Sequence, residues 1–416
     1  MTDRTINRLI FTRRAAVVAL LGFSSGVPLA LSDSTLQAWL TVANLDVSTI
    51  GLFSLVGLPY TIKFLWAPIV DRFDLKFLGR RRDWIFLSQI MLSLTLFFLG
   101  SRVIENDSLA LVGLLAFLVA FISATQDIAV DAYRAEVLKA EERGFGAALS
   151  VTGYRIAMLV SGAGALMLAD VIGFNKTYMI MSLIMFICSL INFFSPDIGR
   201  PHFKEQSIQA LVLEPFKSFF SKEAAFALLG IIFLYKLGDA FAGRLTTTFL
   251  IRGLGFSLTD VGAVNKGLGL MASIIGGLYG GVLMYRLGLY RSLVLFAWLQ
   301  ALTNFGFYIL AILGASYVGL VAVIGLENLA GGMGTAAFVA LLMSVCDRRY
   351  TATQFAILSA VASLGRVFAG PPSGLLVENL GWSIFFALTV VISLPVIYLL
   401  AQFRTVVEHH DRSEPI

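Results

Sequence analysis

The tetrapeptide STIG at residues 48–51 has a counterpart, TDVG, at residues 259–262, a shift of 211 residues along the chain. The same shift lays Arg155 on Arg366. Each tetrapeptide stands where a long apolar stretch begins, and each arginine stands inside such a stretch. These coincidences predict that six membrane helices recur as six in parallel orientation, so that the chain consists of two similar halves.

Twelve stretches of the chain are apolar enough and long enough to form membrane helices, each of which needs about 20 residues. The sequence therefore predicts an all-α polytopic membrane protein with two six-helix halves, 1–196 and 223–416, the second ending in a short cytoplasmic tail. A cytoplasmic linker at 197–222 is expected to join them. The expected spans are about 15–42, 48–69, 84–102, 108–133, 144–169, 177–195, 224–251, 258–285, 292–314, 316–344, 352–377 and 382–403.

The composition agrees with a membrane protein and argues against several other classes. Hydrophobic residues make up 58% of the chain and charged residues 14%, against about 45–50% and about 25% in soluble domains. The basic residues stand in short loops, so the net charge of +5 does not indicate nucleic-acid binding. Cys188 and Cys346 show no metal or disulfide spacing, and His202, His409 and His410 lie outside the spans. We therefore expect no metal site, no bound cofactor and no buried histidine relay.

The basic residues also predict the orientation in the membrane. Most of the 31 lysines and arginines fall in the two termini and in the loops on one side. The loops on the opposite side hold only Arg102, Lys176 and Arg252. Because loops rich in Lys and Arg stay in the cytoplasm, both termini are predicted to be cytoplasmic.

The loop after the second span, WAPIVDRFDLKFLGRRRDW (66–84), combines acid and basic residues. Asp71 near a helix end can hold Arg72 and accept hydrogen bonds from a neighbouring helix terminus, as a latch that breaks and re-forms when the halves rock. Asp131, near the cytoplasmic end of the fourth span, is the predicted partner of Arg72. The alternative is a solvated basic loop that only enforces topology.

This loop resembles the G-x-x-x-D-R-x-G-R-R signature of the major facilitator superfamily, lengthened by an insertion and with Ala67 where glycine is usual. GVLMYRLG (281–288) resembles a degenerate second copy, with Tyr285 in place of the acid. The resemblance implies two six-helix halves with the substrate path between them.

Longer runs inside the spans resemble the bacterial AmpG-type muropeptide permeases, and the resemblance covers nearly the whole chain. It implies proton-driven uptake of anhydromuropeptides through the bacterial inner membrane, with the proton gradient and the lipid bilayer as partners. We expect the protein to work as a monomer. The runs are GFSSGVPLALSDSTLQAWL (22–40), LVGLPYTIKFLWAPIVDRF (55–73), SATQDIAVDAYRAEVL (123–138), ERGFGAALSVTGYRIAMLVSG (142–162), GDAFAGRLTTTFLIRGLGFS (238–257), ENLAGGMGTAAFVALLMSVC (327–346) and TATQFAILSAVASLGRVFAGPPSG (351–374).

A muropeptide offers hydroxyls, acetamides, amides and a carboxylate, which suit hydroxyl, amide, aromatic and basic side chains. Arg155 and Arg366 are expected to attract the peptide carboxylate. For each polar residue the alternative is helix–helix hydrogen bonding or static ion pairing, and Lys236 with Asp239, three residues on, is a candidate static pair. The predicted substrate-binding residues are Gln37, Lys63, Gln126, Tyr154, Arg155, Asn328 and Arg366.

Asp127 is the predicted carrier of the coupling proton, because a carboxylate at membrane depth is costly and is a functional-site candidate. Arg155 is expected to supply a cation to it in one state, and Glu327 is the second candidate. The alternative is that Asp127 pairs permanently with a basic residue and only holds helices together.

Asp33 and Arg244 are predicted to form a gate. The 211-residue shift lays one on the other, so both are expected in the periplasmic half, at matching depth and with opposite charge. We expect them to meet when the periplasmic side closes. Lys266 is an alternative partner for Asp33.

Other functions remain open at this point. A major facilitator protein for another amphiphile, such as acetyl-coenzyme A or a drug, would share the fold. A membrane enzyme would need a nucleophile–base pair or a metal cluster, which the spans do not offer. A passive pore would favour repeated rings of charge over asymmetric mixed charges.

Overall fold

The computed structural model describes residues 12–72, 77–102, 104, 109–138, 143–196, 217–222, 224–346 and 351–412. Within these ranges the regular structure is helical and contains no strand. The chain divides into two compact units. The first comprises residues 1–45, 56–202 and 257–262, and the second comprises residues 46–55, 203–256 and 263–416.

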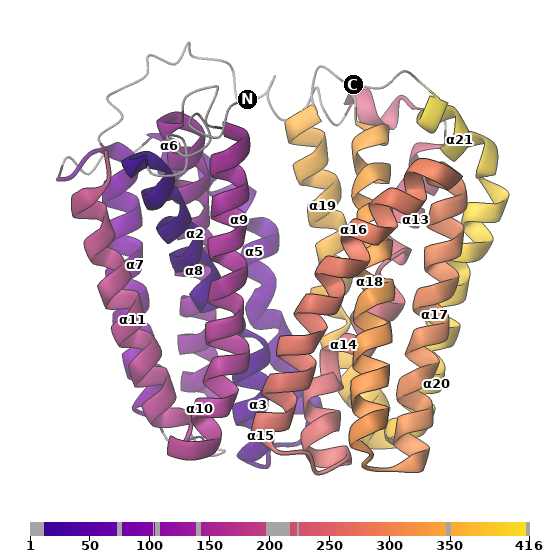
Figure 1. Ribbon diagram of the computed structural model, residues 1–416, viewed down its shortest axis with the longest axis horizontal. Coiled ribbons are helices and arrows are strands. Elements are labelled where there is room, and N and C mark those ends of the chain that lie inside the picture. The colour runs from indigo at the N-terminus through magenta and orange to yellow at the C-terminus, as the bar shows by residue number, and fades with distance from the viewer. Residues whose placement is uncertain are drawn as a thin grey trace. The chain divides into compact units, whose positions relative to one another are not determined.

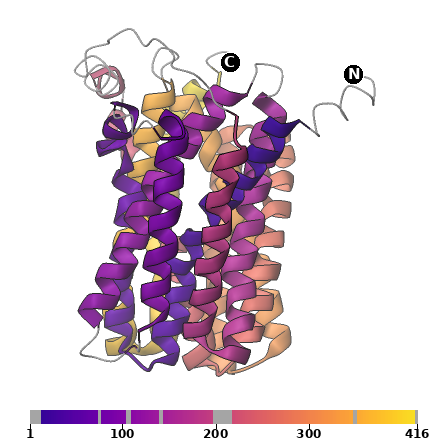
Figure 2. The same cartoon turned by 90° about the vertical axis from the view of Figure 1, so that its left-hand side faces the viewer.

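The long helices of the first unit run side by side (Figures 1 and 2). Helix α2 packs against α8 and α9, and α7 packs against α8 and α11. Short 3-10 turns at Phe53–Gly57 and Lys63–Leu65 interrupt the second span, and a π-helical segment at Leu159–Gly164 separates α9 from α10. The helices between residues 12 and 196 are α2 (Arg13–Ser32), α3 (Ser34–Val42), α4 (Val47–Leu52), α5 (Leu58–Ile62), α6 (Ala67–Arg72), α7 (Arg80–Gly100), α8 (Leu109–Val137), α9 (Arg143–Met158), α10 (Ala165–Ile172) and α11 (Phe174–Phe194).

The second unit is built mainly on α16 packed against α18, and on α17 packed against α18 and α20. Further π-helical segments occupy Phe249–Gly253 and Val261–Leu268. The helices after residue 224 are α13 (Ala225–Leu234), α14 (Leu237–Thr248), α15 (Leu258–Asp260), α16 (Gly269–Leu287), α17 (Leu289–Leu313), α18 (Tyr317–Val345), α19 (Thr351–Phe368), α20 (Gly370–Gln402) and α21 (Arg404–Arg412).

Eleven continuous apolar stretches of the described residues are long enough to cross a membrane. The last, Ile357–Gln402, is 46 residues long, or about 70 Å as helix, roughly twice the thickness of the hydrocarbon. It covers most of the last two predicted spans, 352–377 and 382–403. A left-handed residue, Gly381 (φ 76°, ψ 170°), breaks the helical path between them. The predicted all-α polytopic fold is confirmed. The described residues contain eleven apolar stretches rather than the twelve predicted spans, because the last two spans are joined without a polar break.

Glycines allow the closest helix contacts in each unit. A Cβ atom at Gly22 would collide with the backbone carbonyl oxygen of Ser150, so α2 and α9 approach at backbone distance. A Cβ atom at Gly276 would likewise collide with the carbonyl oxygen of Leu329 between α16 and α18. Close backbone approach of this kind is how membrane helices gain packing energy without a hydrophobic driving force.

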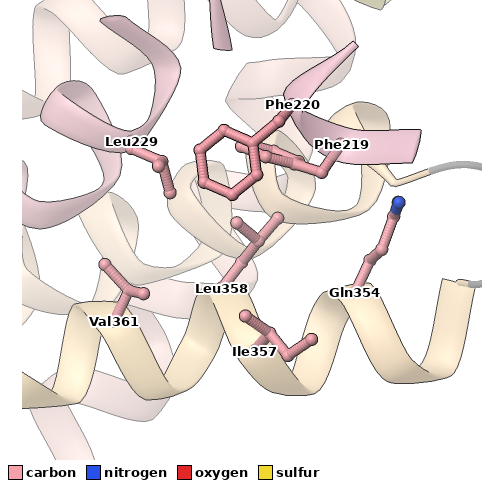
Figure 3. A pocket seen from close by; sticks show the side chains of 7 residues that line it. All are labelled: Phe219, Phe220, Leu229, Gln354, Ile357, Leu358 and Val361. Atoms are coloured by element: carbon pink, nitrogen blue, oxygen red, sulfur yellow. The ribbon is translucent and has the colours of Figure 1, made fainter. Parts of the chain in front are cut away.

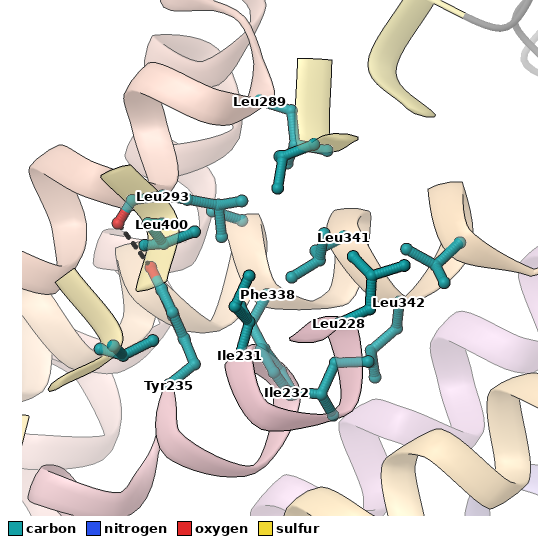
Figure 4. Packing of buried hydrophobic residues seen from close by; sticks show 14 of the residues in the cluster. Leu228, Ile231, Ile232, Tyr235, Leu289, Leu293, Phe338, Leu341, Leu342 and Leu400 are labelled. Carbon is teal, nitrogen blue, oxygen red and sulfur yellow. Dashed lines mark hydrogen bonds between the residues drawn. The ribbon is translucent and has the colours of Figure 1, made fainter. Parts of the chain in front are cut away.

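The core of the second unit lies where α13, α17, α18 and α20 meet (Figure 4). Leucine, isoleucine and phenylalanine side chains fill it, with Leu228, Leu293 and Leu341 fully buried. Tyr235 places its ring in this cluster and its hydroxyl donates to the carbonyl oxygen of Leu293 at 3.2 Å. The polar tip is therefore satisfied while the ring adds apolar area.

The two repeated tetrapeptides make the same kind of contact, each with a carboxylate of its own unit. In the second unit the Ser48 N–H donates to Glu378 Oε1 at 2.8 Å, and its hydroxyl donates to Oε2. In the first unit the Thr259 N–H and hydroxyl donate to Asp170 Oδ2 at 3.2 and 2.6 Å. Each carboxylate thus satisfies a backbone donor in the first turn of a helix.

Candidate functional site

Charged and polar side chains inside the spans gather in two clusters, one in each unit. In the first unit Asp127, on α8, lies with Oδ2 at 3.8 Å from the Lys63 ammonium nitrogen. Lys63 begins the 3-10 turn that follows α5. Among the described residues, Lys63 is therefore the cation seen beside Asp127. Arg155, which was expected to act on Asp127, lies on α9 with an exposed side chain. The expectation that Arg155 serves Asp127 in another state stays a prediction.

Besides Asn192 Oδ1 on α11, five buried polar atoms of the first unit have no hydrogen-bond partner among the described residues. They come from three elements that pack around Asp127. The Tyr60 hydroxyl interacts with the Ser123 and Ser32 hydroxyls, and the Ser25 hydroxyl interacts with the Asp127 carboxylate, so these groups partly satisfy one another. The atoms are Ser25 Oγ, Tyr60 Oη, Ser123 Oγ, Gln126 Oε1 and Asp127 Oδ1.

A hydrogen-bonded network holds the Gln126 side chain in place. The Gln126 and Gln89 amide nitrogens both donate to Ser24 Oγ, at 3.1 and 2.8 Å. The Asn192 amide nitrogen donates to Gln89 Oε1 at 2.7 Å. Helices α2, α7, α8 and α11 are joined in this way, and Gln126 is fully buried.

The cluster of the second unit is centred on Lys236. Its ammonium donates to Asp239 Oδ2 at 3.3 Å, Gln300 Oε1 at 2.7 Å and the Gly331 carbonyl oxygen at 3.1 Å. The other Asp239 oxygen accepts from the Asn304 amide at 3.4 Å. The Lys236–Asp239 pair considered from the sequence is present, and with three acceptors the ammonium uses all of its hydrogen-bonding capacity.

Glu327 and Asn328 lie beside this cluster on α18. The Asn328 amide nitrogen donates to Glu327 Oε2 at 2.7 Å and to the Ile324 carbonyl oxygen at 3.0 Å, and its oxygen accepts from the Ser273 hydroxyl at 3.1 Å. The charges of Asp239, Lys236 and Lys266 act on Glu327. Asn328 therefore positions Glu327, while direct contact of Asn328 with substrate stays a prediction.

The other candidates are spread over both units. Arg155 and Arg366 are exposed, and Gln37 and Tyr154 are half-buried. Arg244 donates through Nε to the Arg366 carbonyl oxygen at 2.8 Å.

Asp33 has φ −123° and ψ −96° and interrupts the helical path between α2 and α3. It belongs to the first unit, and Arg244 belongs to the second. The predicted gate between Asp33 and Arg244 stays a prediction.

The predicted latch at the second loop falls partly outside the described residues, because the side chains of Asp71 and Arg72 are not among them. Asp131 is described, and its Oδ1 accepts from Arg134 Nη2 at 3.0 Å, within the same helix. The pairing of Arg72 with Asp131 stays a prediction.

The sequence reasoning missed an ion pair beside this loop. Arg81 Nη2 lies 2.8 Å from Glu136 Oε1, and the Arg81 side chain is only 5% exposed. Asp83 accepts from the backbone N–H groups of Phe77 and Leu78. No spacing in the sequence signalled this pair, because Arg81 stands in the basic loop before the predicted span at 84–102.

A small cavity in the second unit does not fit a sugar-peptide cargo (Figure 3). Its volume is about 80 Å³, whereas ligand pockets usually measure about 300–1,000 Å³. Gln354 is the one polar side chain among the seven that line it. The cavity is too small and too apolar for hydroxyl or carboxylate recognition.

Known proteins resemble the chain over nearly its whole length. The family profile of the Major Facilitator Superfamily matches residues 15–353 and, in a second match, residues 251–415. The anhydromuropeptide permease of Escherichia coli is 47% identical over 403 residues, which cover 97% of this chain and 82% of that protein. A putative AmpG-type transporter of Rickettsia conorii is 34% identical over 412 residues, which cover 96% of this chain and 99% of that protein.

Solved structures agree on the fold. A nucleoside transporter superposes with a TM-score of 0.73 at 14% identity, covering 94% of this chain and 99% of that one. A D-xylose–proton symporter superposes with a TM-score of 0.72 at 12% identity, covering 94% and 97%. At such low identity these likenesses establish the architecture alone.

Proposed function

We propose the function of this chain from its family: it belongs to the anhydromuropeptide permease family of the major facilitator superfamily. It takes up anhydromuropeptides, which are N-acetylglucosaminyl–anhydro-N-acetylmuramyl units with a short peptide, for cell-wall recycling. The observation that carries this proposal is the 47% identity to the Escherichia coli permease over 97% of the chain. A match of this extent spans both halves rather than one shared motif.

Asp127 carries the coupling proton in this proposal, with Glu327 as the second candidate. The support is the position of Asp127 inside a span with Lys63 as its charged neighbour. Protonation of Asp127 would remove the charge that attracts Lys63, so the ammonium would be released toward an acceptor on the cargo. A contact made in only one protonation state shifts the population of conformations by its own interaction free energy.

Arg155 and Arg366 bind the carboxylate at the peptide end of the cargo in this proposal. Both side chains are exposed although both residues lie in apolar helices. A guanidinium matches a carboxylate with two parallel hydrogen bonds.

The protein is proposed to be a multi-pass protein of the bacterial inner membrane with both termini in the cytoplasm, which the distribution of Lys and Arg supports. It works as a monomer and as a transporter rather than an enzyme. Its partners are the muropeptide, protons and the lipid bilayer.

The proposed function is tested by uptake of labelled anhydromuropeptide into right-side-out vesicles under an imposed inward pH gradient. We expect uptake above that of vesicles without the protein, and competition by unlabelled muropeptide. Acetyl-coenzyme A serves as the competing cargo. If acetyl-coenzyme A were taken up and muropeptide were not, the function would be transport of another amphiphile.

A further inference from the structure

The 211-residue repeat relates one helix pair in the first unit to one helix pair in the second. It lays α2 on α13 and the start of α14, and it lays α9 on α19. The contact between α2 and α9 is called the first seam below. Its counterpart, the contact of α19 with α13 and the start of α14, is called the second seam. The repeat allows the two seams to be compared position by position.

The first seam is packed at backbone distance. A Cβ atom at Gly26 of α2 would collide with the carbonyl oxygen of Tyr154, as one at Gly22 would with that of Ser150. A Cβ atom at Gly153 of α9 would collide with the backbone of α2. Helices that touch through their backbones have no space in which to change their separation.

Bulky side chains stand at the equivalent positions of the second seam. Where the first seam has its three glycines, the second has Phe233, Leu237 and Leu364. A Cβ atom at Gly365 of α19 would meet the Leu237 side chain, at 3.3 Å, rather than a backbone oxygen. The second seam is therefore made by side chains, which can rearrange when the helices move.

The second seam also contains the apolar cavity (Figure 3). Leu229 of α13 lines one side of it, and Ile357 and Val361 of α19 line the other. Phe220, from the segment before α13, adds a further wall and is 45% exposed. Atoms that line a cavity lose packing contacts across it. The two helices can therefore approach each other here without displacing a packed core.

The opposite end of α19 is fixed to α14. The Arg366 carbonyl oxygen accepts from Arg244 Nε at 2.8 Å, and Gly365 lies against Leu237. The space that the cavity provides therefore lies beside the part of α19 that precedes this attachment.

We propose that α19 pivots about its attachment to α14 during the transport cycle and closes the cavity against α13. The inference rests on the proposed function, because it names the helix that moves within the second unit when access to the cargo changes. Packed interfaces change between discrete arrangements rather than continuously. The cavity marks where a second arrangement of α19 is available.

The test fills the cavity. Val361→Phe adds a ring on the α19 side and should hold the helix in its observed position. The melting temperature of the purified protein should rise, and the protein should still bind muropeptide. The rate of muropeptide uptake into vesicles should fall by about 10-fold, because the added contacts favour one position of the helix over the other. Val361→Ala enlarges the cavity and should lower the melting temperature while uptake persists.

Val391→Phe is the matched control. Val391 lies on α20 and is 57% exposed, and it does not line the cavity. The same substitution there adds the same volume without changing the second seam. The melting temperature and the uptake rate should both equal those of the wild type.

A cleavable cross-link provides a second measurement, which decides the question if Val361→Phe fails to fold. Leu229→Cys is combined with Val361→Cys in a protein whose native cysteines, Cys188 and Cys346, are replaced by alanine. A cleavable bifunctional thiol reagent that joins the two new cysteines should stop uptake, and its cleavage should restore uptake. Uptake that survives the cross-link contradicts the pivot.

The remaining outcomes separate the two proposals. If the wild type takes up muropeptide and Val361→Phe, with a raised melting temperature, takes it up at the same rate, the pivot is wrong and the proposed function stands. If the wild type takes up no muropeptide, the proposed function is overturned together with the pivot.

Discussion

Two lysine–carboxylate pairs at membrane depth differ in how completely they are bonded, and that difference assigns their roles. Lys236 donates to Asp239, to Gln300 and to a backbone carbonyl. Lys63 lies 3.8 Å from Asp127, beyond hydrogen-bonding distance. A saturated pair resists rearrangement, whereas a loose pair beside unpartnered groups can exchange partners. We therefore propose a structural role for the Lys236–Asp239 pair and a role in transport for the Lys63–Asp127 pair.

Lys236→Ala should destabilise the protein, because it leaves the Asp239 carboxylate inside the span without its cation. Removing one partner of a buried pair costs about 3–5 kcal/mol. The effect should lie near 3 kcal/mol, since the two side chains are 20% and 17% exposed. Thermal unfolding in detergent measures it, with the exposed Lys176→Ala as control. Equal melting temperatures for the two variants would contradict the structural role.

Arg155→Gln and Arg366→Gln should each weaken muropeptide binding by about 1–3 kcal/mol, the cost of leaving a charged group unpaired. Binding of the peptide-free disaccharide should not change, because it lacks the peptide carboxylate. The exposed Arg286→Gln is the control for a general loss of positive charge. A carboxylate role would be wrong if both ligands lost affinity equally.

At the scale of elements, the start of α4 carries an N-cap from Asp46 in addition to the contact between Ser48 and Glu378. The Asp46 carboxylate accepts from the Thr49 N–H at 2.7 Å. Hydrogen bonding by the Thr49 side chain and backbone lowers the pKa of Asp46, with a smaller contribution from the charge of Arg252, and burial opposes the shift. A lowered pKa means that the charged carboxylate stabilises the fold above its unfolded pKa of about 3.9. This stabilisation is lost as the pH falls through the folded value.

Asp46→Ala should therefore lower the free energy of unfolding by about 0.5–2 kcal/mol at neutral pH. Asp46→Ser keeps a capping oxygen and serves as the matched control. The difference between wild type and Asp46→Ala should shrink as the pH falls below about 4. Thermal unfolding measured across this pH range checks the sign, and a difference that grows in acid would contradict the cap.

Hydropathy predicted most of the elements, because each residue contributes to membrane insertion almost independently of its neighbours. The second span is less regular than its apolar pattern indicates, since 3-10 turns at Phe53–Gly57 and Lys63–Leu65 interrupt it. The second of these turns presents Lys63 to α8. Pairing across helices depends on such local rotations, so the proximity of Lys63 to Asp127 could not be predicted from spacing. The Arg81–Glu136 pair was missed for the same reason.

At the scale of the whole molecule, the repeat predicts two halves, 1–196 and 223–416, and this division stays a prediction, whereas the chain divides into two compact units with different bounds. Residues 46–55 are grouped with the second unit and residues 257–262 with the first. These segments contain the two tetrapeptides that reveal the repeat, and each is bonded to a carboxylate, Glu378 or Asp170, of the unit with which it is grouped. The similarity between the two tetrapeptides shows that their positions in the repeat are equivalent. It does not show which carboxylate each tetrapeptide contacts.

The central claim is that a proton on Asp127 drives uptake of anhydromuropeptide. The most direct measurement is the accumulation ratio of labelled muropeptide in right-side-out vesicles under an imposed pH gradient, for wild type and for Asp127→Asn. We predict that the wild type accumulates muropeptide above the external concentration, and that Asp127→Asn, present in the membrane in equal amount, only equilibrates it. Wild-type accumulation by Asp127→Asn, with unchanged dependence on the gradient, would contradict this claim and transfer the coupling role to Glu327.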